Sequence, residues 1–375
     1  MANKERVTKL FLDLLKINSP SKRERKVADF LKARLQSLGF DVCEDDAGEK
    51  IGGDAGNIIA FKKGTAPGAK SIFLGAHIDT IESTDKLNVV IEGDEVRSDG
   101  TTILGADDKA GIAAILEGIE SVLDSGSSHG DIQVVFNVAE EIGLMGSRAM
   151  DISQINADFG YIFDTQKPAG GITVSAPSHA NMFIDIKGRA AHAGMAPEHG
   201  ISAILAASNA ISKMKLGRID FETTANIGVI EGGKARNIVP DHVEIKAEAR
   251  SRDESKLLAQ VEHMTAVFES EAEAIGANAV VRCDREYFSF KWTQDDEIVK
   301  LAVAACNKIG IEPTFMDGGG GSDANIFNAA GIACVVVGVG YDGAHSSSER
   351  ISLNDLATAA AFVQAIIETA ARAEE

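Results

Sequence analysis

The first 40 residues carry apolar side chains at the spacing of two amphipathic helices. Apolar residues three or four positions apart lie on one face of a helix and favour burial of that face. The segment Ser19-Pro20-Ser21 separates two such groups, because proline and serine interrupt helices. The first group is Val7, Leu10, Phe11, Leu14 and Leu15, and the second is Val27, Phe30, Leu31 and Leu35. The pattern predicts two helices in this region.

Short apolar runs further along the chain predict buried β-strands. Glycine and aspartate bound these runs, which is typical of interior strands in an α/β sheet. The runs cover residues 57–61, 71–76, 132–138, 159–163 and 332–337. Helical patterns at residues 109–123 and 298–309 lie between some of them. This alternation predicts an α/β fold with a mostly parallel sheet and helices on both faces.

A different pattern in residues 178–287 predicts an inserted α+β domain. The order of its elements, β-α-β-β-α-β, is that of a ferredoxin-like split βαβ unit. Its strand-like pieces are residues 182–186, 225–230, 243–249 and 279–282, and its helix-like pieces are residues 202–214 and 254–275. We therefore predict a discontinuous domain of residues 1–177 and 288–375 and an inserted domain of residues 178–287.

Composition and charge limit the partners that we expect. The chain has 375 residues, which suits two domains better than one core. Its 56 acidic and 37 basic residues give a formal charge of −19. An acidic surface gains no Coulomb energy from phosphate backbones or anionic lipid headgroups. We therefore expect neither nucleic acid nor a membrane surface as a partner.

Two further features indicate a cytoplasmic protein. The longest apolar run, residues 332–339, is shorter than the roughly 18 to 20 residues of a membrane span. Asp13 interrupts the apolar segment 10–15, whereas a signal peptide needs an uncharged run. The cysteines form no C-x-x-C pair, so we expect four buried thiols and neither disulfides nor a cysteine metal site. They are Cys43, Cys283, Cys306 and Cys334.

Histidine and acidic side chains follow the predicted strands, where an open α/β sheet binds its ligands. Most of these residues come within about eight positions of a strand's carboxyl end, whereas Asp107 lies in a turn, residues 105–109, that opens a helix. In chain order they are His77, Asp79, Asp107, Glu140, Glu141, Asp164 and His345. We expect them to converge on one edge of the sheet.

Two histidines among several carboxylates suit Zn²⁺, Co²⁺ or Mn²⁺. Glu140 and Glu141 point to opposite faces of an extended segment, so one can bind metal while the other acts as a base. His77 and Asp79 share a face, where Asp79 can hold the imidazole. Taken singly, such residues are also typical of helix caps and solvated surfaces. Their convergence after successive strands favours the metal site.

Several short motifs combine these residues with glycines and alanines. They are His77-Ile78-Asp79-Thr80, Gly105-Ala106-Asp107-Asp108-Lys109-Ala110-Gly111, Ala139-Glu140-Glu141-Ile142-Gly143, Asp164, Gly188-Arg189-Ala190-Ala191-His192-Ala193-Gly194 and Gly319-Gly320-Gly321-Ser322-Asp323-Ala324-Asn325. As a set they resemble the M20 metallopeptidases, most of all the peptidase T (tripeptide aminopeptidase) branch. The resemblance spans nearly the whole chain and implies a zinc exopeptidase-like fold with an inserted lid domain.

The resemblance implies a co-catalytic pair of zinc ions in each chain, with Co²⁺ or Mn²⁺ as substitutes. His77 and Asp164 would hold one ion, Glu141 and His345 would hold the other, and Asp107 would bridge them.

The resemblance also implies roles for residues that are not ligands. Asp79 would orient His77, and Glu140 would be the general base on a metal-bridging water. A cis peptide bond is implied between Asp107 and Asp108.

In the lid domain, the resemblance implies that His192 stabilises the oxyanion and that Asn237 and Arg250 contact the substrate. The implied substrate is a small peptide, and the implied activity is that of an aminopeptidase acting on tripeptides. A homodimer through the lid domain is a further expectation.

Other activities stay open from the sequence. An M20-type amidohydrolase of another specificity, either an N-acyl amino acid deacylase or a carboxypeptidase, is the alternative. A metal-binding protein without catalysis is disfavoured because Glu140 and His192 are both present.

Overall fold

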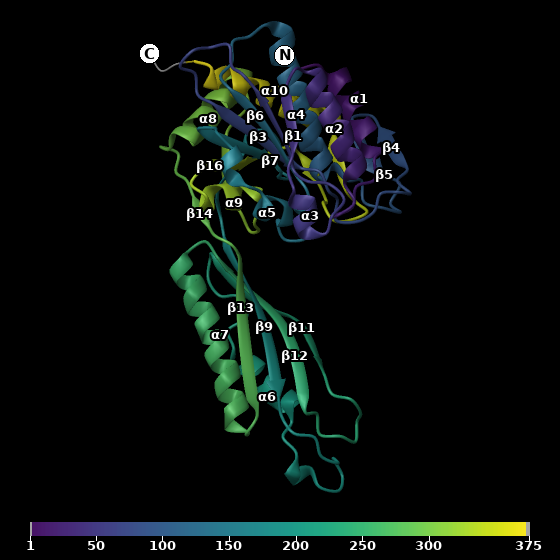
Figure 1. The fold of residues 1–375 in the computed structure, drawn as a ribbon, viewed down its shortest axis with the longest axis vertical. Helices are drawn as coiled ribbons and strands as arrows, with labels where there is room; N and C mark the ends of the chain where they lie inside the picture. Colours follow the sequence, from purple (N-terminus) through teal and green to yellow (C-terminus); the bar gives the residue numbers. More distant parts are fainter. Residues whose placement is uncertain (1, 373–375) are drawn as a thin grey trace. The chain divides into compact units, whose positions relative to one another are not determined.

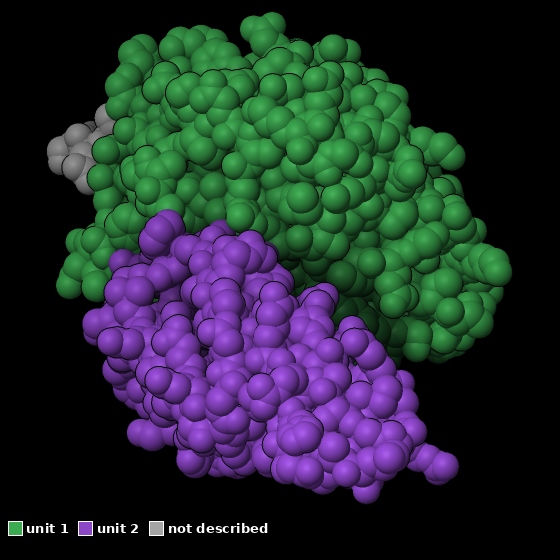
Figure 2. All heavy atoms as spheres, turned by 60° about the horizontal axis from the view of Figure 1, so that its bottom comes forward, with its two compact units in different colours: residues 1–175, 292–318, 322–375 green, residues 176–291, 319–321 purple. Residues whose placement is uncertain are grey.

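The computed structural model describes residues 2–372 and divides into two compact units, coloured separately in Figure 2. Unit 1 comprises residues 1–175, 292–318 and 322–375, and unit 2 comprises residues 176–291 and 319–321. The division from the sequence placed the inserted segment at 178–287 and left residues 319–321 with the other domain. Each unit is described by itself below.

The central sheet of unit 1, part of which is labelled in Figure 1, is parallel in its middle. Its strands are β1 (Asp41–Glu44), β2 (Ile58–Lys62), β3 (Ile72–His77), β6 (Ile132–Asn137), β7 (Phe159–Phe163), β8 (Gly171–Ala176), β15 (Thr314–Asp317) and β16 (Ala333–Val337). They run in the order β1-β2-β6-β3-β7-β16-β8, with β15 also beside β8. Neighbours from β6 to β16 are parallel, whereas β1, β2 and β8 pair antiparallel within this order. The predicted mostly parallel sheet is confirmed.

Helices cover both faces of this sheet, as the sequence predicted. In unit 1 they are α1 (Lys4–Leu15), α2 (Arg25–Ser37), α3 (Ala47–Ile51), α4 (Ala106–Ser125), α5 (Met145–Ala149), α8 (Glu297–Ile309), α9 (Asp323–Ala329) and α10 (Leu353–Ala370). Helix α4 packs against α10, α1 and β3, where Leu74 joins the large apolar core. The preceding residue, Phe73, points to the opposite face of the sheet and contacts Phe327 of α9, with ring centroids 4.7 Å apart. Successive residues of a strand point to opposite faces, so α4 and α9 lie on opposite sides of β3.

A small antiparallel sheet in unit 1 was not predicted. It consists of β4 (Val89–Glu92), β5 (Glu95–Ser98), β17 (Tyr341–Asp342) and β18 (Arg350–Ser352), in the order β17-β18-β5-β4. Its strands are two to four residues long and mix charged with apolar residues, so they give no clear periodic signal. The turn between β17 and β18 carries His345.

The long elements of unit 2 follow the predicted ferredoxin-like order β-α-β-β-α-β, and the two-residue strands β10 (Gly217–Arg218) and β14 (Phe290–Lys291) are additional. The long elements are β9 (Ser178–Lys187), α6 (Ala203–Lys213), β11 (Thr223–Gly232), β12 (His242–Ser251), α7 (Glu254–Ala274) and β13 (Asn278–Tyr287). An antiparallel sheet runs in the order β10-β11-β12-β9-β13. Alternate residues of β9, among them Met182 and Ile184, are buried in a core shared with Phe268 of α7. The alternation fixes which face of the sheet the helices cover.

The expectation of four buried thiols is wrong for two cysteines. Cys306 and Cys334 are buried, but Cys43 and Cys283 are exposed. Both exposed thiols lie on strands at the edge of a sheet, β1 and β13, where fewer neighbours cover a side chain. Within residues 2–372, no helix is long and apolar enough to cross a membrane.

Candidate metal centre

His77 is the last residue of β3 and is buried, with 2% of its surface exposed. Its Nδ1 lies 3.1 Å from the backbone carbonyl oxygen of Asp79. A carbonyl oxygen only accepts hydrogen bonds, so Nδ1 carries the proton in this contact. Nε2 is then the ring atom that faces the carboxylates at the carboxyl edge of the sheet, where it could bind a metal ion in place of a proton.

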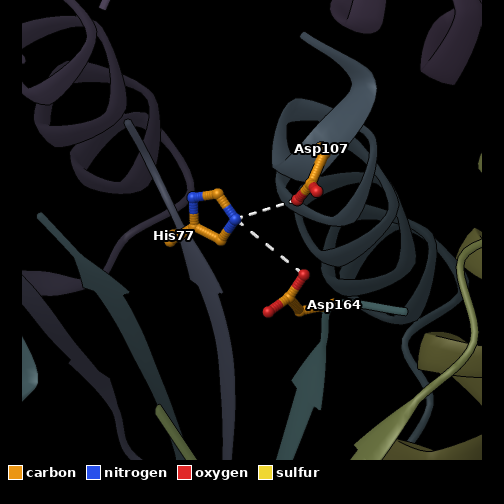
Figure 3. Close-up of side chains that lie close together, drawn as sticks. All are labelled: His77, Asp107 and Asp164. Atoms are coloured by element: carbon orange, nitrogen blue, oxygen red, sulfur yellow. Dashed lines mark hydrogen bonds and ion pairs between the residues drawn. The ribbon is translucent and has the colours of Figure 1, made fainter. Parts of the chain in front are cut away.

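One candidate ligand group, which we call the His77 group, consists of His77, Asp107 and Asp164 (Figure 3). The Nε2 atom of His77 lies 2.9 Å from Asp107 Oδ1 and 3.8 Å from Asp164 Oδ1. Asp164 directly follows β7, the strand next to β3. Three donor atoms from neighbouring elements therefore face one point.

Close packing of α4 against β7 brings Asp107 and Asp164 together. Gly111 makes the approach possible, because a Cβ there would lie 2.1 Å from the Phe163 carbonyl oxygen and 2.3 Å from Asp108 Oδ1. Asp107 and Asp108 have non-helical backbone angles at the start of α4. The peptide bond between them is cis, as the resemblance implied.

A second candidate group, the His345 group, shares Asp107 and adds Glu141 and His345. The Nε2 atom of His345 lies 2.9 Å from Glu141 Oε2 and 3.4 Å from Asp107 Oδ2. Asp107 thus uses a different carboxylate oxygen toward each histidine. The five side chains that the resemblance named as metal ligands lie in these two groups.

Asp79 organises the turn that carries the two glutamates. Its Oδ1 accepts the backbone N–H of Glu140 at 2.9 Å, and its Oδ2 accepts that of Glu141 at 3.3 Å. The hydroxyl of Ser21 also donates to Oδ2, at 2.6 Å.

Glu141 joins the His345 group, whereas Glu140 belongs to neither group. The sequence prediction assumed an extended segment, whereas the chain turns here, with the N–H groups of Gly143 and Leu144 donating to the Glu140 carbonyl oxygen. The two glutamates differ in position within this turn.

The carboxylates of the centre are crowded and largely shielded from solvent, with 12% of the Asp107 and Asp164 side chains exposed. Burial raises the pKa of Asp164 to about 8 and the pKa of Glu140 well above its usual range. Hydrogen bonds to Asp107 and Glu141 raise the pKa of His345 to about 10. Bound protons therefore offset the negative charge of these carboxylates, and divalent cations would displace the protons on binding. Once these protons are lost, the imidazole and carboxylate groups are donors that fit borderline ions such as Zn²⁺.

Sequence reasoning missed two buried residues beside the centre, Tyr341 and Glu349. The hydroxyl of Tyr341 donates to Asp164 Oδ1 at 2.9 Å and lies 3.3 Å from Asp107 Oδ1. Glu349 accepts three backbone N–H groups in the turn before Asp107. Their spacing from His345 could have indicated them in the sequence, because Tyr341 lies four residues before it and Glu349 four residues after it.

The three predicted substrate-binding residues lie in unit 2. His192 and Asn237 are exposed on adjoining loops, where the N–H of Ala193 donates to the carbonyl oxygen of Asn237 at 2.9 Å. The Nδ1 atom of His192 accepts the N–H groups of Gly194 and Met195, each at 3.2 Å. Its Nε2 makes neither of these contacts and can therefore hydrogen-bond to another group.

Arg250 is separate from these loops, on β12. Its guanidinium donates to Glu248 at 2.9 Å, and His179 contacts the same carboxylate at 3.0 Å. Hydrogen bonds from His179 and Arg250 lower the pKa of Glu248 to about 2, against the effect of burial. Arg250 is thus held by an ion pair within unit 2.

A third cluster with metal-ligand chemistry lies on the sheet of unit 2. It consists of Asp185, His242 and Glu244, with His242 Nε2 2.8 Å from Asp185 Oδ2. The three side chains are partly or fully exposed. Lys187 lies 3.6 Å from Asp185 and already supplies a positive charge there. We treat this cluster as a surface ion-pair network.

Comparisons with known proteins identify relatives of this chain. The model of "Peptidase family M20/M25/M40" matches residues 73–369. The protein YqjE of Bacillus subtilis is 45% identical over 372 residues, which cover 99% of this chain and 100% of that protein. The crystal structure of aminopeptidase PepT from Bacillus cereus shares 42% identity and a TM-score of 0.94, covering 99% of this chain and 100% of that one. A tripeptidase from Staphylococcus aureus shares 39% identity and a TM-score of 0.95, covering 99% of each chain.

Fold and centre together define an α/β protein with a candidate two-ion centre at the carboxyl edge of its sheet. The matches specify it further: the chain belongs to peptidase family M20/M25/M40. Within that family it is similar to peptidase T proteins, as its motifs indicated.

Proposed function

We propose that this chain is a dinuclear zinc exopeptidase that removes N-terminal residues from short peptides, tripeptides above all. The observation that carries the proposal is the position of Asp107. Its Oδ1 lies 2.9 Å from His77 Nε2, and its Oδ2 lies 3.4 Å from His345 Nε2. A carboxylate shared in this way would suit two cations. Relatives described as a tripeptidase and an aminopeptidase support peptide substrates.

The donor set supports zinc as the metal, with Co²⁺ or Mn²⁺ as substitutes. His77 and Asp164 would hold one ion, Glu141 and His345 the other, and Asp107 both. Once bound, the ions would lower the pKa of a water molecule and polarise the peptide carbonyl group.

Glu140 is the residue that we assign to proton transfer. It belongs to neither ligand group, and Asp79 holds its backbone N–H at 2.9 Å. In the proposed reaction, Glu140 accepts a proton from the attacking water and delivers it to the nitrogen of the leaving amine. Proton transfer of this kind contributes about 10² to 10⁴-fold to the rate.

The substrate would be held by residues of unit 2. We assign oxyanion stabilisation to His192 and substrate contacts to Asn237 and Arg250. The exposed Nε2 side of His192 supports its role, because Nδ1 already accepts two backbone N–H groups. A hydrogen-bond donor to the developing oxyanion is typically worth about 10² to 10³ in turnover.

A panel of matched peptides tests the proposed specificity. Zinc-loaded protein is incubated with trialanine, its N-acetylated form, its C-terminal amide and N-acetylalanine, and the products are identified by mass spectrometry. An aminopeptidase releases alanine from trialanine and its amide but leaves both acetylated compounds intact. Cleavage of N-acetylalanine would favour a deacylase, and release of the C-terminal residue from N-acetyl-trialanine would favour a carboxypeptidase. Either result would contradict the proposal.

A further inference from the structure

Three side chains from one short segment meet the shared carboxylate residue Asp107. Tyr341, His345 and Glu349 are spaced four residues apart, yet no helix carries them: Tyr341 is the first residue of β17, and His345 and Glu349 lie in the turn between β17 and β18. His345 has a left-handed backbone conformation, with φ of +61°, in this turn. The convergence is therefore a product of the turn.

Each of the three side chains reaches a different atom of Asp107. The hydroxyl of Tyr341 lies 3.3 Å from Oδ1, and His345 Nε2 lies 3.4 Å from Oδ2. The Oε1 atom of Glu349 accepts the backbone N–H of Asp107 at 2.9 Å. Main chain and side chain of Asp107 are thus fixed from one segment. Of the three residues, only His345 is a proposed ligand.

Tyr341 also reaches the His77 group directly. Its hydroxyl donates to Asp164 Oδ1 at 2.9 Å, and the residue is 2% exposed. Asp164 Oδ1 is also the oxygen that lies 3.8 Å from His77 Nε2. A single phenolic proton therefore sets the direction in which this carboxylate points.

Glu349 fixes the turn before Asp107. Its Oε2 accepts the N–H groups of Leu104 and Gly105 at 2.8 and 2.7 Å, in addition to the bond from Asp107 to Oε1. Glu349 is 1% exposed, so no water can replace a lost acceptor easily. The carboxylate acts as a common acceptor for a turn with no other regular structure.

We propose that Tyr341 and Glu349 are positioning residues that set the affinity of the centre for its metal ions. The inference rests on the proposed metal pair and adds residues that bind no metal themselves. Tyr341 acts through Asp164 Oδ1 and Asp107 Oδ1, so it governs the ion of the His77 group. Glu349 acts through the main chain of the shared residue Asp107, so it governs both ions.

Zinc affinity of variants tests the inference without using activity. Zinc is titrated into metal-free protein in competition with a chromophoric chelator. Partners of metal ligands typically contribute about 10 to 100-fold in affinity. We therefore expect Tyr341→Phe to weaken one binding step by that factor and Glu349→Gln to weaken both steps.

Two matched substitutions serve as controls. Tyr161 is buried and donates to the carbonyl oxygen of Ile298 at 2.9 Å, away from the centre. Glu117 is buried and accepts the N–H of Asn3 at 2.7 Å. Tyr161→Phe removes a buried hydroxyl group, and Glu117→Gln removes a buried carboxylate charge that also pairs with Arg6. Neither substitution should change either zinc affinity. Thermal unfolding of every metal-free variant verifies that it is folded.

Three results would overturn the inference. The first is wild-type zinc affinity in folded Tyr341→Phe and Glu349→Gln, with two ions still bound by the wild-type protein; the proposed function would then stand alone. The second is an equal loss of affinity in the control variants, which would show a general structural effect. The third is a tyrosinate absorption band that appears with zinc in the wild type and is lost in Tyr341→Phe, which would make Tyr341 a ligand. A wild-type protein that binds no zinc would instead overturn the proposed function, and the inference with it.

Discussion

Asp79 places the two glutamates of the centre by accepting their backbone N–H groups with its two carboxylate oxygens. The chain turns directly after Glu140, whose carbonyl oxygen accepts the N–H groups of Gly143 and Leu144, and Glu140 and Glu141 have different surroundings. Glu141 lies 2.9 Å from His345 Nε2, and Glu140 lies in no ligand group. Asp79 thus supports different roles for the two glutamates, with Glu140 as the proposed base and Glu141 as a proposed metal ligand.

Substitution of the two glutamates tests this separation. Glu140→Gln should lower turnover by at least about 10²-fold, because the general base is lost, and should still bind two zinc ions. Glu141→Gln should bind one ion less, because its carboxylate completes the His345 group. Metal content by elemental analysis and turnover of trialanine measure both effects. Equal metal loss in the two variants would show that both glutamates are ligands.

At the scale of elements, an ion pair fastens α1 to α4, the helix that begins at the metal centre. Glu117 of α4 is fully buried and accepts from Arg6 Nε at 2.5 Å and Arg6 Nη2 at 3.0 Å. Removing the cation from such a pair leaves an unpaired buried charge, which lowers the free energy of unfolding by about 3 to 5 kcal/mol.

Arg6→Met should therefore lower the free energy of unfolding by about 3 to 5 kcal/mol, measured by urea denaturation. The double variant Arg6→Met/Glu117→Gln removes the stranded charge and should recover part of the loss. A single variant as stable as the wild type would show that α1 is held by apolar packing alone.

A second link between elements is sensitive to acid. Burial acts to raise the pKa of Glu44 on β1, but hydrogen bonds from Arg25, the Gly56 N–H and Lys32 lower it to about 2. A carboxyl whose pKa is lowered on folding stabilises the protein above its ordinary pKa near 4.5. This contribution is lost as the pH falls through the folded-state value of about 2.

Glu44→Gln should therefore be less stable than the wild type at pH 7, by about 1 kcal/mol because solvent screens the partly exposed pair. The difference should shrink as the pH is lowered from 5 to 2. Thermal unfolding of both proteins across this range measures it. A difference that is independent of pH would contradict the role of the Glu44 charge.

Some strands were predictable from the sequence because complete burial requires runs of mostly apolar residues, which are recognisable along the chain. The strands β3, β6 and β7 are mostly apolar and buried along their whole length. The rule that ligands gather at the carboxyl ends of strands led from them to His77 and Asp164. Strands β17 and β18 are two and three residues long, so no period can show. The functions of Tyr341 and Glu349 depend on a turn whose path only the folded chain defines. Cys43 was misjudged because nothing in its neighbourhood in sequence shows that β1 is an edge strand.

At the scale of the whole molecule, a dimer with shared active sites is a proposal that mixing experiments can test. Glu140→Gln and His192→Ala each remove one proposed role and should be inactive alone. If His192 acts on the active site of a partner chain, subunit exchange should restore activity, because a hybrid dimer has one site with its own Glu140 and the partner's His192. Exchange without recovery would show that His192 acts within its own chain.

The turnover of trialanine as zinc is added to metal-free protein tests the two-ion centre most directly. We expect no turnover without metal, release of the N-terminal alanine as zinc is bound, and a maximum near two equivalents per chain. Full turnover by metal-free protein, or a maximum at one equivalent with no second ion bound, would contradict the two-ion centre around Asp107.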